Sequence, residues 1–269
     1  MLSINKLKLI AKEARKLIIE VACLSKSAHV GSSLSCVDLL VSLYFHQLKL
    51  QKNKWAKRDI FILSKAHGAM ALYSVLRLKG FISDSILRDY FKNNGTLPAH
   101  LDRFTNKAIE ASAGSLGHGF NMALGMAYSF KLKGKNRKVY SLIGDGESQE
   151  GSIWEGALFA PKLGLDNLTV IMDHNNLQGY GRPTEICCFE PVIKKWEAFG
   201  WQACRVNGHS FSEIITAFNK PNKGKPKIII ADTCKGKGVS FMENQMKWHY
   251  FIVTEELKNK ALNCICREI

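Results

Sequence analysis

The chain has 269 residues, enough for one large domain or two small ones, with 46% apolar and 23% charged residues. These proportions are typical of a globular protein and exclude a disordered chain, a collagen-like repeat and a small disulfide-stabilised scaffold. The net charge is +15, but lysines and arginines are spread along the chain rather than gathered in arginine-rich runs. We therefore interpret the charge as a basic surface that attracts anionic metabolites or an acidic partner, and we expect no nucleic acid ligand.

No segment has the composition of a membrane span. The longest mostly apolar stretch, 37–45, is interrupted by Asp38 and Ser42 and is far shorter than the ~20 residues that a spanning helix needs. The N-terminal residues mix lysines with apolar side chains at helical spacing, which is not the pattern of a secretory signal. We predict a soluble, cytoplasmic protein with no membrane partner, and we expect its eight scattered cysteines to be free, reduced thiols.

The first predicted elements are mainly helical. Apolar side chains recur every three or four residues over 4–25, which predicts an amphipathic helix. A second and more buried helix is expected over 34–48. A short apolar strand is predicted at 60–63, and Ser64 is the expected N-cap of a helix over 66–79.

Strands and helices alternate in the second half of the chain. Apolar runs predict strands at 139–143, 168–172, 201–206 and 228–231. Helices are expected between them at 152–163, 190–199 and 212–218. This alternation predicts an α/β fold, a doubly wound and mostly parallel sheet with helices on both faces, formed by residues 1–269 as a single domain. In such folds ligands bind beyond the carboxyl ends of the strands.

The strongest chemical signal lies at two of those strand ends. The sequence Gly-Asp-Gly-Glu occupies 144–147, and Asp-His-Asn-Asn occupies 173–176, so Asn175 follows Asp145 by thirty residues. The glycines let a ligand approach the backbone closely. One carboxylate, one amide oxygen and backbone oxygens suit Mg²⁺ or Ca²⁺, with phosphate and water completing the shell. The helix expected next along the chain would point its N-terminus toward the anion.

This arrangement resembles the thiamine diphosphate motif, and nearly the whole sequence is similar to the N-terminal, pyrophosphate-binding part of the transketolase family. Five further motifs stand in the family's order: Ser-Ala-His-Val-Gly at 27–31, Ser-Lys-Ala-His-Gly at 64–68, Pro-Ala-His at 98–100, Gly-Ser-Leu-Gly-His-Gly at 114–119, and Lys-Gly-Lys-Gly at 235–238 leading to Trp248-His249. The likeness is greatest to the short, split transketolases, whose catalytic unit consists of two polypeptides.

The resemblance implies a set of site residues. His67 and His249 are expected to reach the diphosphate and the substrate side of the cofactor. His29 and His100 are expected to hydrogen-bond the hydroxyl groups of the sugar, which makes four catalytic histidines. The expected thiamine diphosphate pocket comprises His67, Gly114, Leu116, Gly144, Asp145, Gly146, Glu147, Asn175, Leu177 and His249. The expected ligands of Mg²⁺, with Ca²⁺ or Mn²⁺ as substitutes, are Asp145, Asn175 and Leu177.

Two further positions bear on the likeness. Glu150 resembles an acidic residue at the interface between family subunits, and its alternative interpretation is a first-turn glutamate favoured by the helix dipole. Tyr250 follows His249 where the family usually has glycine. That departure either reshapes the mouth of the site or changes the route of the C-terminal helix.

The sequence ends at Ile269, before the family's pyrimidine-binding domain, its activating glutamate and the arginines that hold the sugar phosphate. The resemblance therefore implies an obligate C-terminal transketolase subunit, with two copies of each chain, and the transfer of a two-carbon ketol unit between phosphorylated sugars. Two alternatives stay open: the alpha subunit of a 2-oxo acid dehydrogenase, and a non-catalytic subunit that binds the cofactor. The family's 1-deoxyxylulose-phosphate synthases are disfavoured because each is one longer chain. Both the pentose phosphate pathway and a specialised sugar route fit the sequence.

Overall fold

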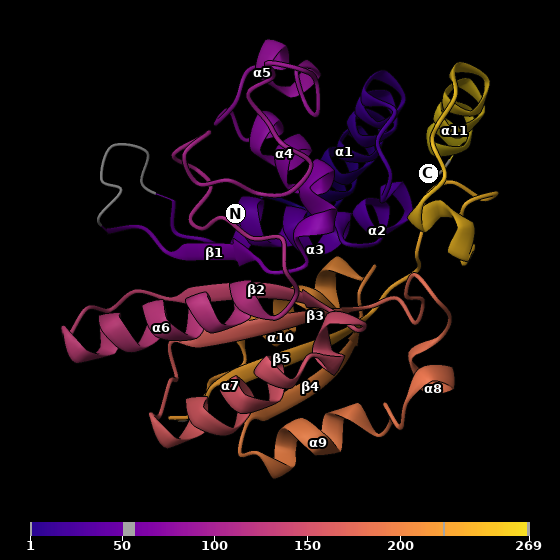
Figure 1. Ribbon diagram of the computed structural model, residues 1–269. Helices are drawn as coiled ribbons and strands as arrows, with labels where there is room; N and C mark the ends of the chain where they lie inside the picture. Colours follow the sequence, from indigo (N-terminus) through magenta and orange to yellow (C-terminus); the bar gives the residue numbers. More distant parts are fainter. Residues whose placement is uncertain (1, 51–56, 223, 268–269) are drawn as a thin grey trace.

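The computed structural model describes residues 2–50, 57–222 and 224–267 (Figure 1). Its centre is a five-stranded sheet in the order β1-β2-β3-β5-β4, in which every neighbouring pair is parallel. The strands are β1 (Ile60–Leu63), β2 (Val139–Gly144), β3 (Leu168–His174), β4 (Gln202–Asn207) and β5 (Lys227–Asp232). The predicted parallel α/β sheet is confirmed, and each predicted strand lies within two residues of its observed bounds.

The strand order brings three segments together at one edge of the sheet. Gly144 of β2 pairs with Asp173 of β3, and Asp173 pairs with Ala231 of β5. Because the strands are parallel, the segments that follow them leave the sheet side by side. The Gly-Asp-Gly motif, the Asn-Asn motif and the segment after β5 therefore meet there, although β5 comes last in the chain.

Helices cover both faces of the sheet, as predicted (Figure 1). Alternate strand residues point to opposite faces, so Ile229 of β5 packs into one core layer and Ile228 and Ile230 pack into the other. The layer with Ile229 contains α1 (Ile4–Ser25), α2 (Val30–Ser35), α3 (Val37–Ser42), α4 (Ala69–Leu78) and α10 (Phe211–Asn219). The opposite layer contains α6 (His118–Leu132), α7 (Gly151–Lys162) and α9 (Val192–Ala198).

The remaining elements of the described residues are short turns and three further helices. They are the π-helical turn η1 (Leu43–Gln47), the 3₁₀ turns η3 (Ala66–Gly68), η4 (Glu147–Gln149) and η5 (Met246–His249), and the helices α5 (Asp84–Arg88), α8 (Pro183–Ile186) and α11 (Glu255–Arg267). None of the helices in the described ranges combines the length and the apolar character needed to cross a bilayer. All eight cysteines lie in those ranges and carry free thiols.

Two predictions about helices need correction, and one helix was missed. The helix expected over 34–48 begins at Val30 and is divided into α2, α3 and η1. At the first division the buried Ser35 hydroxyl bonds to the Ser32 carbonyl and to the Asp173 carboxylate, which competes with helical backbone bonding. Ser64 does not cap the helix that follows it; its hydroxyl donates to Glu147 and accepts from the Phe120 N–H group in the first turn of α6. Helix α6 was not predicted, because its two glycines at 119 and 125 weaken the apolar pattern.

Candidate functional site

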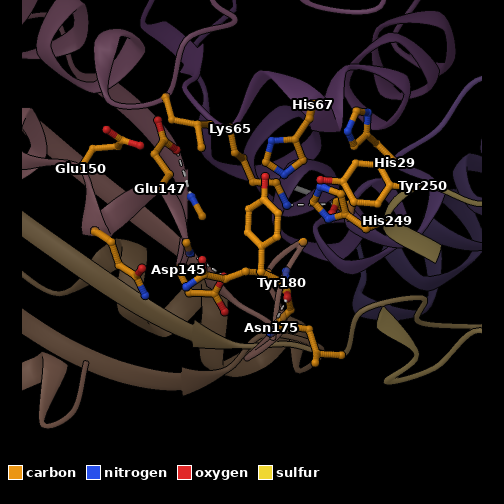
Figure 2. A pocket seen from close by; sticks show the side chains of 18 of the residues that line it. His29, Lys65, His67, Asp145, Glu147, Glu150, Asn175, Tyr180, His249 and Tyr250 are labelled. Atoms are coloured by element: carbon orange, nitrogen blue, oxygen red, sulfur yellow. Dashed lines mark hydrogen bonds between the residues drawn. The ribbon is translucent and has the colours of Figure 1, made fainter. Parts of the chain in front are cut away.

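A cavity of about 420 Å³ opens at the carboxyl end of the sheet (Figure 2). All of the site residues predicted from the sequence line it: His29, His67, His100, Gly114, Leu116, Gly144, Asp145, Gly146, Glu147, Asn175, Leu177 and His249. The structure therefore brings the separate motifs into one space. Glu150 and Tyr250 also line the cavity, so Tyr250 lies where the first of its two expected consequences, a reshaped mouth, would act.

Asp145 is held rigidly at the end of β2. Its two carboxylate oxygens accept hydrogen bonds from the N–H groups of Gly146 (2.8 Å) and Asn176 (2.6 Å). The residue is only 3% exposed, and burial together with the charge of Asp173 raises the pKa of its carboxyl group. A cation bound in the adjoining cavity would stabilise the charge of this buried carboxylate.

The three expected metal ligands present oxygen atoms from two neighbouring loops. The Asn175 side-chain oxygen accepts from the Leu177 N–H group at 3.1 Å, and the Leu177 carbonyl accepts from Lys235 Nζ at 3.0 Å. In the described ranges no cluster of three His, Cys, Asp or Glu side chains is arranged to hold a metal. One carboxylate, one amide oxygen and one carbonyl nevertheless fit Mg²⁺, which takes oxygen ligands and completes its shell with phosphate and water.

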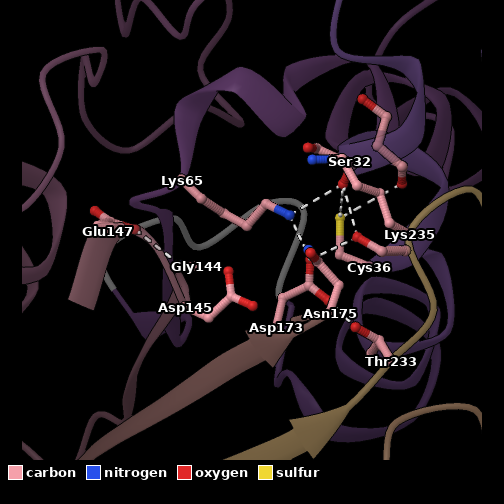
Figure 3. Close-up of polar contacts among 12 residues, drawn as sticks. Ser32, Cys36, Lys65, Gly144, Asp145, Glu147, Asp173, Asn175, Thr233 and Lys235 are labelled. Carbon is pink, nitrogen blue, oxygen red and sulfur yellow. Dashed lines mark hydrogen bonds and ion pairs between the residues drawn. The ribbon is translucent and has the colours of Figure 1, made fainter. Parts of the chain in front are cut away.

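At the floor of the cavity lies a buried ion pair, in which Lys65 lines the cavity and Asp173 lies behind it (Figure 3). Both residues are fully buried, and Asp173 also accepts hydrogen bonds from Ser35 (2.6 Å), Thr233 and the Asn175 amide (3.3 Å). Burial disfavours both charged forms, but the attraction between the two groups and their hydrogen bonds is the larger effect. The pKa of Lys65 is therefore raised and the pKa of Asp173 is lowered. The pair stays ionised and fixes the Asn175 side chain beside Asp145.

Four histidine rings gather on the opposite side of the cavity. The ring of His29 lies 5.0 Å from His249, 5.5 Å from His67 and 6.2 Å from His100, between centroids. Burial, then nearby positive charge, lowers the pKa of His29 to about 4 and of His249 to about 3, and lowers the pKa of His67 well below its ordinary value. These three imidazoles are neutral at pH 7, so each offers one donor and one acceptor nitrogen.

Lys235 orients one of these histidines. The lysine is fully buried, and its ammonium group donates to the Leu177 carbonyl at 3.0 Å and to Nδ1 of His249 at 2.9 Å. An ammonium group can only donate, so Nδ1 of His249 accepts and the ring proton sits on Nε2. Lys235 therefore connects the loop after β3 to His249 and sets the tautomer of its ring.

The two glutamates of the Gly-Asp-Gly segment differ in their contacts. The buried Glu147 carboxylate accepts from Ser64 and from the N–H groups of Gly117 (2.9 Å) and Gly144 (3.1 Å), although burial still raises its pKa. It thus fastens three cavity segments together. Glu150 is exposed at the start of α7, and its side chain makes no capping hydrogen bond. No hydrogen bond therefore supports the alternative interpretation of Glu150 as a glutamate that stabilises the first turn of α7.

Four residues in or below the cavity were not predicted as site residues: Lys65, Asp173, Lys235 and Tyr180. Lys65 and Lys235 stand inside quoted motifs, and Asp173 opens the Asn-Asn motif, so their positions were visible. Their pairing was not, because Lys65 and Asp173 are 108 residues apart. Tyr180 has no sequence pattern that marks it as a cavity residue.

Comparison with known proteins extends these observations. Residues 6–260 match the family model described as transketolase, thiamine diphosphate binding domain. The chain is 40% identical, over 94% of its length and 93% of the relative, to the 6-deoxy-6-sulfo-D-fructose transketolase subunit SqwG of Clostridium sp. (strain MSTE9). It is 37% identical, over all of its length and 96% of the relative, to an apulose-4-phosphate transketolase subunit of Phocaeicola vulgatus.

A solved transketolase, that of Campylobacter jejuni, has the same fold. It superposes with a TM-score of 0.92 at 31% identity, over 98% of this chain but only 43% of the Campylobacter chain. The sequence therefore spans less than half of that transketolase and nearly all of the two subunits above.

Proposed function

The chain belongs to the transketolase family, and from that premise we propose that it is the N-terminal subunit of a split transketolase. The complete enzyme would transfer a two-carbon ketol unit from a phosphorylated ketose to an aldose acceptor. The observation that carries the proposal is the gathering of every family motif around one cavity at the carboxyl end of the sheet. The family match over 6–260 also supports a single thiamine diphosphate-binding domain.

The residues that line the cavity support thiamine diphosphate together with a magnesium ion as its ligands. When bound, this cofactor supplies the nucleophilic carbon and the electron sink that cleavage of a carbon–carbon bond beside a carbonyl group requires. Asp145, Asn175 and the Leu177 carbonyl would hold Mg²⁺, or Ca²⁺ or Mn²⁺ in its place, next to the diphosphate. The glycines at 114, 144 and 146 leave room for the cofactor against the backbone, and Leu116 and Glu147 complete the wall.

The histidines would bind the sugar and donate or accept protons. His29 and His100 would bind the sugar hydroxyls, and a neutral His29 can accept a proton from a hydroxyl group and return it. His249 would donate from Nε2, because Lys235 occupies its Nδ1. His67 would complete the diphosphate side of the cluster, where its neutral ring avoids adding charge to a crowded site.

A second polypeptide is part of the proposal. Both relatives are named as subunits, and the described lining of the cavity includes no arginine that could bind a sugar phosphate. We propose a C-terminal transketolase subunit, two copies of each chain, and a contact between Glu150 at the cavity rim and that second polypeptide. The names of the relatives refer to a sulfonated and a phosphorylated sugar, which supports a ketose donor with an anionic end.

Such charged metabolites do not cross membranes unaided, which supports a cytoplasmic reaction in carbohydrate metabolism.

The test is an activity assay on the reconstituted pair. The C-terminal subunit, this chain and their mixture are each supplied with xylulose 5-phosphate, an aldose acceptor, thiamine diphosphate and Mg²⁺, and release of glyceraldehyde 3-phosphate is followed. We expect activity in the mixture alone, and none when Mg²⁺ is chelated. A stable mixture that binds the cofactor but transfers no ketol unit from any ketose would contradict the proposal.

A further inference from the structure

Two tyrosines from distant segments meet at the mouth of the cavity (Figure 2). Tyr180 belongs to the loop after β3, and Tyr250 follows η5 directly. Both line the cavity, yet Tyr180 is 85% exposed and Tyr250 is 54% exposed. Partial burial and the neighbouring Tyr180 hydroxyl raise the pKa of Tyr250, so the two phenols interact while each keeps a face toward solvent. We call Tyr180 and Tyr250 the tyrosine pair.

The position of Tyr250 is set by contacts on several sides. Its ring lies 4.6 Å from the ring of His249 and 6.2 Å from that of His29, between centroids. A Cβ atom at Gly179 would lie 2.8 Å from the Tyr250 hydroxyl, so that hydroxyl occupies space left by a missing side chain. The His29 N–H group donates to the His249 carbonyl at 2.9 Å, which holds the segment before Tyr250 against the histidine cluster. Tyr250 is therefore an ordered wall of the site.

The tyrosine pair contributes no charge to the mouth, where the exposed Glu150 carboxylate is an anionic neighbour at the rim. A phenol is uncharged at pH 7, donates and accepts hydrogen bonds, and offers an apolar ring face. Among the described residues that line the cavity, the basic side chains other than histidine are limited to Lys65, and its charge is paired with Asp173. Such a mouth suits the hydroxyl groups and C–H faces of a sugar and leaves its anionic end to other groups.

We propose that the tyrosine pair binds the hydroxyl-bearing carbons of the donor sugar beyond the two that are transferred, and so selects among donor sugars. The inference rests on the proposed ketol transfer and deepens it. A ketose whose first two carbons lie at the histidine cluster must extend past Tyr250 to reach solvent, because Tyr250 stands beside His29 and His249 at the opening.

The test compares two kinds of donor in the reconstituted complex. One is 3-hydroxypyruvate: its bond to the carboxylate breaks, CO₂ leaves, and the electron pair stays with the same two-carbon unit that then adds to the aldose carbonyl. The other is whichever of xylulose 5-phosphate, fructose 6-phosphate and sedoheptulose 7-phosphate the wild type uses best. Hydroxypyruvate has no hydroxyl-bearing carbon beyond the transferred unit, so it cannot use the proposed contacts.

For Tyr250→Phe we expect kcat/KM with the sugar donor to fall about three- to tenfold, mainly through KM, as one lost hydrogen bond predicts. With hydroxypyruvate we expect a change within about twofold. Tyr180→Phe should show the same difference between the two donors in the loss of kcat/KM, and Tyr250→Gly should show a larger difference. Phe251→Gly is the matched control, because Phe251 is 57% exposed on the same segment but does not line the cavity. The thiamine diphosphate Kd, measured by calorimetry, should not change in Tyr250→Phe.

The outcomes separate the inference from the function it rests on. An equal loss with both donors, or no loss with either, overturns the role of the pair, and so does a weakened thiamine diphosphate Kd in Tyr250→Phe. A wild-type complex that uses hydroxypyruvate but none of the sugars keeps ketol transfer and overturns donor selection. A complex that uses no donor overturns the proposed function, and the inference with it. Tyr250→Phe removes a single oxygen, so these readings do not depend on Tyr250→Gly folding.

Discussion

The floor and the mouth of the cavity differ in burial and in charge. The floor, Lys65, Asp173 and Lys235, consists of fully buried charged groups whose polar atoms all have partners (Figure 3). At the mouth, Tyr180 and Tyr250 are uncharged rings that are 85% and 54% exposed. A buried charge that loses its partner is very costly, whereas an exposed ring can be exchanged at small cost. The floor should therefore tolerate little change, and the mouth should be free to vary with the substrate.

Breaking the floor should produce the largest effect. In Asp173→Asn the ammonium group of Lys65 loses its buried counter-charge, and we expect the free energy of unfolding to fall by about 3–5 kcal/mol. Urea denaturation of the cofactor-free chain measures this. Asp84→Asn, which breaks the exposed pair with Arg77, is the matched control and should leave stability nearly unchanged. Equal losses of stability in the two variants would mean that the buried Lys65–Asp173 pair contributes no more than the exposed Arg77–Asp84 pair.

The next effect concerns the cofactor. In Asp145→Ala we expect Mg²⁺-dependent thiamine diphosphate affinity to fall about 100-fold or more, because the proposed metal loses its one carboxylate ligand. Calorimetric titration of the assembled complex with and without Mg²⁺ measures the Kd. Unchanged affinity in a folded complex would refute the metal assignment.

Lys235→Met removes the charge at nearly constant length and tests a positioning role. We expect kcat/KM to fall about tenfold, since His249 loses the donor that fixes its tautomer. Nitrogen-15 NMR of labelled histidine should detect protonation on Nε2 in the wild type and a mixture of tautomers in the variant. Lys237→Met is the control on the same loop, where the lysine pairs with Glu243 near the surface. The same tautomer in wild type and Lys235→Met would rule out the positioning role.

The histidine cluster predicts a pH dependence of stability. The pKa of His29 is about 4 and that of His249 about 3, against an ordinary value of 6.5 in the unfolded chain. Between these values the unfolded chain binds more protons, so stability is complete above about pH 6.5 and falls as the pH drops toward 3. Urea denaturation at several pH values measures the slope. His29→Gln together with His249→Gln should flatten it, and an identical slope in this double variant would count against buried neutral rings.

The smallest effect is expected at the mouth. Tyr180→Ala should change the free energy of unfolding by no more than about 0.5 kcal/mol, because the ring is almost fully exposed. Thermal or urea unfolding of the cofactor-free chain measures it beside Asp173→Asn. A loss comparable to that of the floor variant would remove the contrast between the two regions.

Much of the site could be predicted because its signals are local. Glycines beside Asp145, an amide at Asn175 and histidines in recurring short motifs identify themselves within a few residues, and the apolar runs predict the strands that end there. The position of all these residues around one cavity follows from parallel strands with adjacent carboxyl ends. Their roles toward the metal, the cofactor and the sugar stay predictions, as does the second polypeptide.

The amino-acid sequence by itself determined the class of fold, the strands and the chemical groups at their ends, because periodicity and motif spacing act over short distances. Only the tertiary structure decided that Lys65 meets Asp173, that Lys235 meets His249 and that Tyr180 meets Tyr250. Nothing local separates a lysine that will be buried and paired from one that will be solvated. That difference arises when β5 is inserted between β3 and β4 and carries Lys235 beneath the cavity formed by the earlier strands.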